Sequence, residues 1–540
     1  MKWKTLQHNG ILFPPPFKSK GITVKIKGEK VSLNLLQEEM IYQWAKKKDT
    51  PYVQDKVFQK NFVSDFAATL APKPKEKKKT TPSKTEEKIA PKFKNISYSD
   101  IDFTEAYKIV DKEKDSRELM TKEEKKSLAV QRKKIRDEMK EKYGKAILDG
   151  NEVEVANYMA EPPGIFIGRG DHPLRGKWKH RITSEDVTLN LGKEASVPKG
   201  NWEKIIHDKD SMWLASWMDD LTQKRKYVWL SDTAGLKQER DKAKYDKALT
   251  LATQITKIKE GMIKDMKGKD PKIRKIATVC YLIYRTSMRV GDEKDPDEAD
   301  TVGATTLRKE HVKLAGNSIE FDFLGKDSVR WQETIQVVGD DKQFYENLKE
   351  LITNKKPHEE IFDRITSRHV NAYFSGIVKG LTAKVFRTYL ATNQVKDYLK
   401  KHADIKSESP NVKLYHAKMA NLQAAIMCNH KRTIPKTFEN ALQKKREMLK
   451  NIHETKPKTE KQKEKLEERK EKIKLAIDLA EKTRDYNLGT SLRNYIDPRV
   501  FKAWTDEIKA DWEKLYTAAL QKKFLWVKNE SAKWKDIVTQ

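Results

Sequence analysis

The sequence has few cysteines and no long apolar run. Only Cys280 and Cys428 occur among its 540 residues, too few for the disulfide framework of a secreted domain. No apolar stretch approaches the roughly 18 residues that a membrane-spanning helix needs. The opening MKWKTLQHNG also lacks the apolar region of a secretory signal. We therefore expect an intracellular protein with no membrane partner.

Motifs for common cofactors are also missing. The 11 histidines are scattered, and none is paired with a cysteine at the spacing of a structural zinc site. We find no GxxxxGK[ST] phosphate loop and no EF-hand loop. We therefore predict that the protein uses no metal ion, no nucleotide and no other cofactor.

What the sequence has in excess is positive charge. There are 111 Lys and Arg residues against 80 Asp and Glu residues, which gives a formal net charge of +31 and a pI near 9.6. Such a field attracts polyanions, and nucleic acid is the leading candidate. The chain is too long for one hydrophobic core, so we expect two to four domains.

The first half of the chain alternates between foldable and highly polar stretches. Residues up to about Ala71 combine proline turns with β-prone segments such as Ile22 to Ile26, which predicts a small mixed α/β region. Segment 73–94 is nearly all Lys, Glu, Pro, Ser and Thr, which predicts a flexible insertion. Two interpretations of its Lys77, Lys78 and Lys79 stay open, a nuclear-localisation or phosphate-binding patch and a plain solvated loop.

Two further segments of this half have recognisable features. TKEE, beginning at Thr121, is a capping box and predicts a long charged helix that Gly144 ends. The Gly- and Pro-rich loop from Glu161 to Arg181 carries several Arg and Lys residues, a composition suited to phosphate contact.

The second half is expected to be mainly helical, from about Leu236 to Pro435, with one exception. Ile319, Phe321 and Phe323 alternate with acidic residues before Gly325, which predicts a β-hairpin with Lys326 at its turn. Heptad-like apolar spacing on both sides of Pro457 then predicts an antiparallel pair of helices that projects as an arm. The last 55 residues, rich in tryptophan, are expected to form a small helical domain packed on the core.

Five motifs follow one another in this half. They are SMRVGDEKD from Ser287, FLGKDSVRW from Phe323, GLTAKVFRTY from Gly380, CNHKRTIPK from Cys428 and LGTSLRNYIDPR from Leu488. In content and order they closely resemble the active-site motifs of the eukaryotic topoisomerase I family, the type IB DNA topoisomerases. The resemblance continues through EPPGIFIGRGDHP, ADTVGATTLR and KTFENAL, so it covers nearly the whole chain.

The resemblance implies a catalytic set. Matched residue by residue, the family pattern places this set on Arg289, Lys326, Arg387, His430 and Tyr495. Each of these residues taken singly is more often structural, and it is the motif context that favours the catalytic interpretation.

The chemistry of DNA cleavage accounts for these residue types. A tyrosine that attacks a DNA phosphodiester forms a covalent phosphate ester, which stores the energy of the broken backbone bond for religation without ATP. The resemblance implies that the tyrosine becomes joined to the 3′ phosphate and leaves a free 5′ hydroxyl. Two guanidiniums and an imidazole suit the negative charge that develops on the non-bridging oxygens. A lysine suits the role of general acid toward the leaving 5′ oxygen, and Lys326 matches that position.

The resemblance also implies residues beside the cleavage site. Arg169, Asp327 and Asn494, with Phe166 nearby, match positions that in the family frame the pocket of the intercalating inhibitor camptothecin. The alternative for the first three is a salt bridge plus a turn-forming Asn. Lys384, one turn before Arg387, is expected to touch DNA beside the scissile phosphate.

Two positions depart from the family pattern. Ile167 stands where relatives have a second Arg in the GRG loop, and Asp292 stands where they have Asn. Each change makes the local DNA interface less positive, which affects affinity and site preference.

Two other classes of function are compatible with parts of this pattern. A tyrosine site-specific recombinase shares the chemistry, but recombinases usually carry His where this chain has Lys384, and they lack the long helical arm. A non-enzymatic DNA-binding protein would be expected to have lost catalytic positions, yet every one is occupied.

The resulting expectation is an α+β, mainly helical fold that forms a bilobed clamp around double-stranded DNA. It assigns 1–235 to a mixed α/β cap lobe, 236–437 to a helical catalytic lobe of the tyrosine recombinase and type IB topoisomerase kind, 438–485 to a coiled-coil arm, and 486–540 to the domain with Tyr495. We expect a monomeric nuclear enzyme, or one that works in a host nucleus if its source is a virus, that relaxes positive and negative supercoils.

Overall fold

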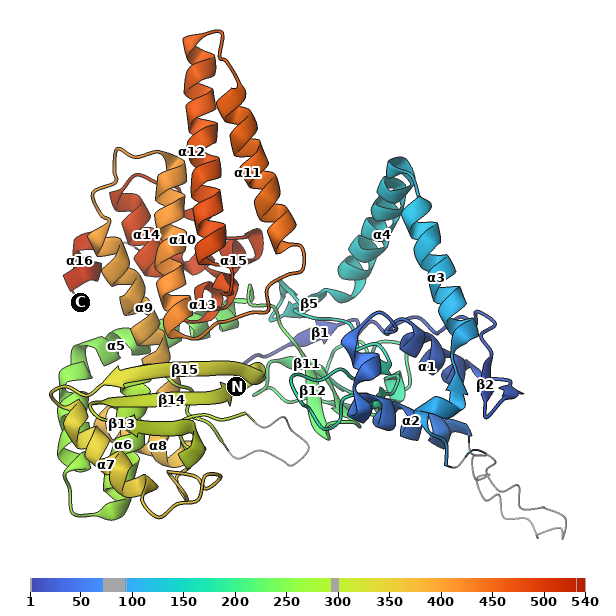
Figure 1. Cartoon of the computed structure of the whole chain (residues 1–540), viewed down its shortest axis with the longest axis horizontal. Coiled ribbons are helices and arrows are strands. Elements are labelled where there is room, and N and C mark those ends of the chain that lie inside the picture. Colours follow the sequence, from blue (N-terminus) through green and yellow to red (C-terminus); the bar gives the residue numbers. More distant parts are fainter. Residues whose placement is uncertain (1, 71–92, 94, 293–300, 531, 540) are drawn as a thin grey trace. The chain divides into compact units, whose positions relative to one another are not determined.

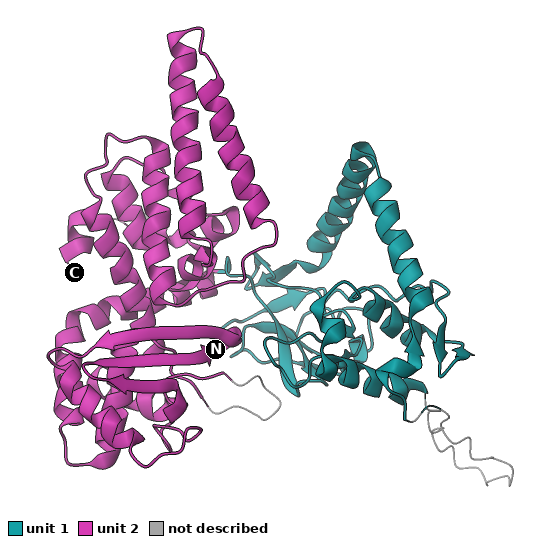
Figure 2. Ribbon diagram, viewed as in Figure 1, with its two compact units in different colours: residues 1–234, 295–299 teal, residues 235–294, 300–540 magenta. Residues whose placement is uncertain are grey.

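The computed structural model describes the whole chain except residues 1, 71–92, 94, 293–300, 531 and 540. The insertion expected at 73–94, with its lysines at 77–79, lies outside the described residues apart from Phe93. The chain divides into two compact units, unit 1 up to Ala234 and unit 2 from Gly235 onward (Figure 2). Each unit is described by itself.

Unit 1 is mixed α/β, as expected for its opening region. Its described strands form four small sheets, in the orders β1-β5-β6, β10-β9-β11-β12, β3-β2-β4 and β7-β8. The strands are β1 (Leu6–His8), β2 (Val24–Ile26), β3 (Glu29–Val31), β4 (Ile101–Asp102), β5 (Lys145–Leu148), β6 (Asn151–Glu154), β7 (Gly164–Ile165), β8 (Trp178–Lys179), β9 (Val187–Asn190), β10 (Lys204–Ile206), β11 (Trp213–Asp219) and β12 (Lys224–Trp229). The helices are α1 (Leu35–Ala45), α2 (Lys56–Leu70), α3 (Thr104–Leu119) and α4 (Lys122–Tyr143).

Helix α4 confirms the capping prediction at both ends. The Thr121 hydroxyl accepts a hydrogen bond from the Glu124 backbone N–H at 3.1 Å, and the Glu124 carboxylate accepts one from the Thr121 N–H at 2.8 Å. Gly144 is the C-cap. No residue of α4 is buried, and α4 forms a V with α3 (Figure 1), so both helices are largely solvated.

An aromatic core holds the remaining helices of unit 1 together. Trp44 of α1 is fully buried and stacks on Phe62 of α2, with ring centroids 4.4 Å apart. The loop that carries Phe166 and Arg169 packs on the same helix. Gly176 of this loop has φ +91°, and a Cβ there would lie 2.2 Å from the Phe58 carbonyl oxygen, so only glycine fits.

Unit 2 is mainly helical and contains one sheet among its described residues. The helices are α5 (Gly235–Met266), α6 (Pro271–Thr286), α7 (Asp341–Ile352), α8 (Ser367–Ile377), α9 (Ala383–Lys401), α10 (Pro410–Met427), α11 (Phe438–Glu454), α12 (Glu460–Lys482), α13 (Leu488–Asn494), α14 (Pro498–Glu507), α15 (Ala518–Lys523) and α16 (Trp534–Thr539). The sheet has the order β13-β14-β15, from β13 (Val312–Ala315), β14 (Ser318–Gly325) and β15 (Val329–Gln336). The predicted hairpin is confirmed, and β13 adds a strand that the sequence reading missed.

Two hydrophobic clusters meet on α9. Its first residues, among them Val385 and Phe386, belong to a cluster with α5, α6, α7, α8 and the sheet. Its later residues, among them Ala391 and Val395, belong to a cluster with α10 and the C-terminal helices. Arg387 lies between the two clusters and is 6% exposed. One helix therefore connects both cores and carries a charged residue at their border.

Helices α11 and α12 run side by side in opposite directions (Figure 1). Leu442, Ile452 and Ile473 are the buried members of the predicted apolar stripe. The second half of α12 is fixed to α10 by two hydrogen bonds. Tyr415 of α10 donates one to Asp478, and Ser409, the N-cap of α10, donates one to Glu471. No helix in the described part of the chain is long and apolar enough to cross a membrane.

The C-terminal tryptophans pack into the core shared with α9 and α10, as expected. Trp504 is fully buried there. We predict that Trp504→Ala lowers the free energy of unfolding by about 3 to 5 kcal/mol, because it leaves a cavity in a close-packed core. The matched change Leu525→Ala, at a side chain that is 46% exposed, should lower it by about 0.5 kcal/mol. Denaturant unfolding measures both, and equal losses would contradict this packing.

Candidate active site

Two helix ends place Arg289 and His430. Helix α6 ends at Ser287, a C-cap in the left-handed region with φ 52°, and Arg289 follows two residues later. Helix α10 is followed by Asn429, which also has a positive φ of 49°, and His430 comes next. In both cases a left-handed residue turns the chain off the helix axis, and the next residues carry the side chain into the site.

The segment after Arg289 packs tightly against residues 301–305. A Cβ on Gly303 would lie 2.5 Å from the Gly291 backbone, so the two glycines allow a close backbone approach. The Ala304 N–H donates to the Arg289 carbonyl at 2.8 Å. The Val302 N–H donates to the Leu324 carbonyl of β14 at 2.8 Å. This ladder fixes Arg289 relative to the hairpin that carries Lys326.

Arg387 joins the two helix ends. Its guanidinium donates to the Ser287 carbonyl at 2.8 Å and also to the Cys428 carbonyl. Its Nε is buried and has no hydrogen-bond partner among the described residues. The guanidinium carbon lies 5.2 Å from the centroid of the Tyr495 ring. Arg387 therefore both supports the site and faces the tyrosine.

Tyr495 follows α13, which is anchored on α10. The Asn421 side chain donates to the Leu488 carbonyl at 3.0 Å and accepts from the Ser491 hydroxyl at 2.7 Å. The His430 carbonyl accepts from the Asn487 N–H at 2.7 Å, so the loop with His430 pairs with the start of α13. The imidazole and phenol rings lie 5.4 Å apart, centroid to centroid.

The charges around Tyr495 are mainly positive. The Arg289 guanidinium lies close to the Tyr495 phenol. Burial, followed by the nearby Arg387 charge, lowers the pKa of Arg289 below its usual value. Burial, together with Arg387 and Arg289, lowers the pKa of His430 to about 3. Both ring nitrogens of His430 are buried without a hydrogen-bond partner in the described part of the chain. The site thus holds a neutral imidazole beside two guanidiniums and can accept an anion.

Lys326 and Lys384 lie exposed. Lys326 begins the three-residue turn of the hairpin, closed by the Gly325 and Val329 pair. It makes no hydrogen bond, ion pair or ring contact with the residues that the structure describes, so the structure does not bring it onto Tyr495. The Asn429 side chain donates to the Arg330 carbonyl at 3.0 Å, which ties this hairpin to the loop of His430.

The remaining predicted residues are divided between the units. Asp327 lies in the hairpin turn with φ 68°, and Asn494 ends α13 and donates to the Thr490 carbonyl at 3.1 Å; both belong to unit 2. Phe166 and Arg169 belong to unit 1, where the Phe166 ring lies 4.9 Å from that of His172. Of the two departures from the family pattern, Asp292 is in unit 2 and Ile167 is in unit 1.

The loop of Glu161 to Arg181 contains ion pairs that its sequence did not indicate. Four of its cations form ion pairs within unit 1: Arg175 with Asp55, Lys177 with Asp65, Lys179 with Glu161, and Arg181 with Glu39. These side chains hold the loop to α1 and α2. Their carboxylate partners are distant in sequence in three of the four cases, so local composition could not reveal them.

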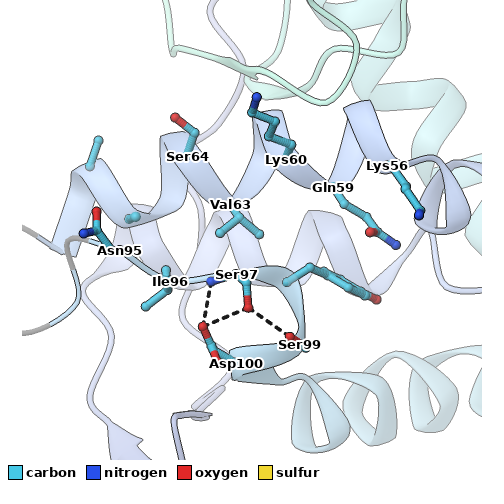
Figure 3. Close-up of a pocket in the computed structure, with 13 residues that line it drawn as sticks. Lys56, Gln59, Lys60, Val63, Ser64, Asn95, Ile96, Ser97, Ser99 and Asp100 are labelled. Carbon is cyan, nitrogen blue, oxygen red and sulfur yellow. Dashed lines mark hydrogen bonds between the residues drawn. The ribbon is translucent and has the colours of Figure 1, made fainter.

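One hollow of unit 1 is separate from the predicted site. It has a volume of about 1120 Å³ and lies between α2 and residues 95–100 (Figure 3). Val63, Ile96 and Tyr98 line it, while Ser97 and Asp100 hydrogen bond to each other. None of the predicted site residues is among its lining. Within the described residues no group of three or more His, Cys, Asp or Glu side chains could hold a metal ion.

Sequence reasoning missed the residues that support the tyrosine. The Thr392 hydroxyl of α9 donates to the Tyr495 carbonyl at 3.3 Å and accepts from the Asp497 N–H at 3.1 Å. Asp497 in turn pairs with Arg499. The sequence signal was present only for Asp497 before Pro498, the pattern of a helix start.

Three family models match consecutive parts of the chain. Residues 1–230 match the one described as the DNA binding fragment of eukaryotic DNA topoisomerase I. Residues 233–465 match its catalytic core, and residues 467–536 match the C-terminal topoisomerase domain.

Curated relatives are similar over 97% of the chain. DNA topoisomerase 1 of Homo sapiens is 34% identical, and the match covers 71% of that protein. DNA topoisomerase 1 of Caenorhabditis elegans is 34% identical with 66% of its length covered. DNA topoisomerase 1 beta of Arabidopsis thaliana is 34% identical with 58% covered. The chain thus spans between somewhat over half and about seven tenths of the length of these relatives.

The lowered pKa of His430 predicts a pH-dependent stability. In the unfolded chain this histidine has a pKa near 6.5, so below that pH the unfolded state binds a proton that the folded state excludes until about pH 3. Stability is therefore lost as the pH falls. Between pH 7.5 and 5.5 the loss from this residue should be about 1 to 1.5 kcal/mol. Denaturant unfolding of wild type and His430→Gln at both pH values isolates it, and an identical pH dependence would contradict the assignment.

Proposed function

Because the chain belongs to the eukaryotic DNA topoisomerase I family, we propose that it relaxes supercoiled DNA by the type IB mechanism. In this mechanism one strand is cut through a covalent 3′-phosphotyrosyl bond at Tyr495, the DNA rotates, and the strand is rejoined. Neither ATP nor a metal ion is needed. Relaxation removes supercoils of both signs.

The convergence of three groups on Tyr495 supports this proposal. Arg289 lies close to the phenol, Arg387 faces its ring, and the imidazole of His430, unpartnered among the described residues, lies beside it. A phosphodiester at this place would meet two fixed cations and one neutral donor. Such preorganised groups stabilise the charge that develops on the non-bridging oxygens of a pentacoordinate phosphorus.

The residues divide the chemistry as follows. The Tyr495 oxygen bonds to the phosphorus and releases its proton to solvent, while the bond from phosphorus to the 5′ oxygen breaks. Lys326 donates a proton to that departing oxygen. Religation reverses each step, because the 5′ hydroxyl attacks the phosphotyrosyl ester and tyrosine leaves. The number of phosphoester bonds is unchanged, so no outside energy source is needed.

The proposed architecture assigns a task to each part of the chain. Residues 1–235 form the cap lobe, 236–437 the catalytic domain, 438–485 the coiled-coil arm and 486–540 the domain with the nucleophile. The two lobes close around duplex DNA as a clamp. The supporting observations are the division after Ala234, the paired helices α11 and α12 and the net charge of +31. A clamp that contacts mainly phosphates selects sequences weakly.

The proposal extends to location and inhibitor. We place the protein in the nucleus as a monomer, or in a host nucleus if its source is viral. Lys384 contacts DNA beside the scissile phosphate. Arg169, Asp327, Asn494 and Phe166 frame a camptothecin site on the cleaved complex.

The first test is relaxation without cofactors. Purified protein should relax positively and negatively supercoiled plasmid in EDTA with no nucleotide, and Tyr495→Phe should bind DNA but form no covalent complex in detergent. Tyr486→Phe, a matched loss of one hydroxyl, should keep covalent capture. A strict requirement for ATP and magnesium, or capture of DNA by Tyr495→Phe, would refute the mechanism.

The second test isolates Lys326. Lys326→Ala should slow cleavage of an ordinary strand by roughly 10² to 10⁴. A strand with sulfur in place of the scissile 5′ oxygen has a leaving group that needs no proton, so the variant should cleave it at nearly the wild-type rate. The control, Arg289→Ala, should be slow on both strands because it acts on the non-bridging oxygens. If Lys326→Ala were equally slow on both strands, Lys326 would act as an electrostatic contact to the phosphate and not as a general acid.

A further inference from the structure

Lys244 of α5 points toward the tyrosine segment from a helix that none of the five motifs includes. Its ammonium donates to the Asn494 carbonyl at 3.1 Å and to the Asp241 carboxylate at 2.8 Å. Its side chain is 22% exposed. Asn494 is the last residue of α13 and directly precedes Tyr495, so Lys244 contacts the peptide group from which the tyrosine extends.

The carbonyl that Lys244 binds lies at a helix end. The last carbonyls of a helix have no partner within the helix and must be satisfied from outside. The partly exposed Lys244 ammonium satisfies one of them with a charge-assisted hydrogen bond, which is stronger than a neutral one. Without this hydrogen bond the last turn of α13 can fray, and Tyr495 then moves together with that turn.

The other side of Tyr495 is fixed independently. Thr392 of α9 holds the Tyr495 carbonyl and the Asp497 N–H. Arg499 pairs with Asp497 and with Asp246 of α5, both at 2.7 Å. The backbone is thus held before the tyrosine by Lys244 and after it by Thr392 and Arg499.

The surroundings of Lys244 assign it an internal task. Burial lowers the pKa of Lys244, Asp241 opposes this shift, and the nearby Lys523 and Lys384 lower the pKa further. Of these lysines Lys384 is exposed and suited to DNA, whereas Lys523 is 8% exposed and pairs with the second Asp241 oxygen at 3.3 Å. Because Asp241 keeps this second partner, the loss of Lys244 does not leave it without a counter-charge.

We propose that Lys244 is a positioning residue for Tyr495, holding the Asn494 carbonyl so that the phenol stays aimed at the scissile phosphate. This rests on the proposed function of Tyr495 as the nucleophile. It adds a residue of α5, which begins where unit 2 begins, to the machinery of cleavage. The same contact aims the leaving phenol during religation, so both directions of the reaction depend on it.

Single-turnover cleavage tests the proposal. The DNA substrate is one whose short fragment, carrying the new 5′ hydroxyl, dissociates after cleavage. Lys244→Met keeps the length of the side chain but removes the ammonium. At saturating DNA it should slow covalent-complex formation by about 10- to 100-fold, since a misplacement near 1 Å can have that effect. Religation should slow by a similar factor, so the cleavage equilibrium should change by less than about threefold, and the Kd for DNA by less than about twofold.

Two variants sharpen this result. Lys244→Arg keeps the charge and the donors and should recover most of the lost rate. Lys242→Met removes the same charge from the same helix, but Lys242 pairs with Glu530 instead of the tyrosine segment, so its cleavage rate should stay within about twofold of wild type.

The outcomes separate the two proposals. A wild-type protein that forms no covalent complex overturns the proposed function itself. An active wild type with Lys244→Met cleaving at the same rate, or weakened only in DNA affinity, overturns the positioning role alone, as does equal slowing by Lys242→Met. If Lys244→Met does not fold, Asp241→Asn takes its place: it frees the ammonium from its orienting partner, and a wild-type rate in that variant overturns the proposal.

Discussion

Arg387 donates hydrogen bonds to the carbonyl oxygens of Ser287 and Cys428, and in doing so it joins the ends of α6 and α10. Arg289 follows the first of these carbonyls by two residues, and His430 follows the second by two. One guanidinium therefore directly links the two segments that carry these side chains. Hydrogen bonds from a charged donor contribute about 1.5 to 3 kcal/mol each, and loss of the donor would also leave two carbonyls without it. A lysine at this position could not reproduce the planar two-point contact.

The site around Arg387 contains polar groups that lack a negatively charged or accepting partner in the described part of the chain. The Nε of Arg387 and both nitrogens of His430 are buried and unpartnered within the described residues, and burial keeps the imidazole neutral. Unsatisfied buried groups destabilise a folded protein. Their concentration around one phenol is understandable if an anion completes them, because a site that is already rigid need not reorganise when charge develops. Under the proposed function, these groups lower stability in exchange for a site that is ready for chemistry.

The sequence predicted those features that depend on near neighbours. The capping box at Thr121, the hairpin around Lys326 and the helices on either side of Pro457 were correct because their signals lie within a few residues. The family resemblance supplied the five site residues. The carbonyl partners of Arg387, the approach of Gly291 to Gly303 and the anchoring by Thr392 and Lys244 were not predicted. These contacts join segments from about 12 to 250 positions apart, and no local pattern encodes them. For the same reason, the carboxylate partners of the cations in the Glu161 to Arg181 loop were not predicted.

The arrangement of the two cores has a consequence for the proposed reaction, in which DNA turns while the protein stays bound. Arg289 and the hairpin of Lys326 belong with the core of α6 and the sheet, whereas Tyr495 packs with the core of α10 and the C-terminal helices. Helix α9 passes through both, and it carries Arg387 at their border and Thr392 one turn and a half further on. A helix buried on both sides transmits displacement as a rigid body, since its close-packed side chains do not deform gradually. Tyr495 and the cations are thereby kept in register although they come from different cores, which is what the proposed rejoining of a strand after rotation requires.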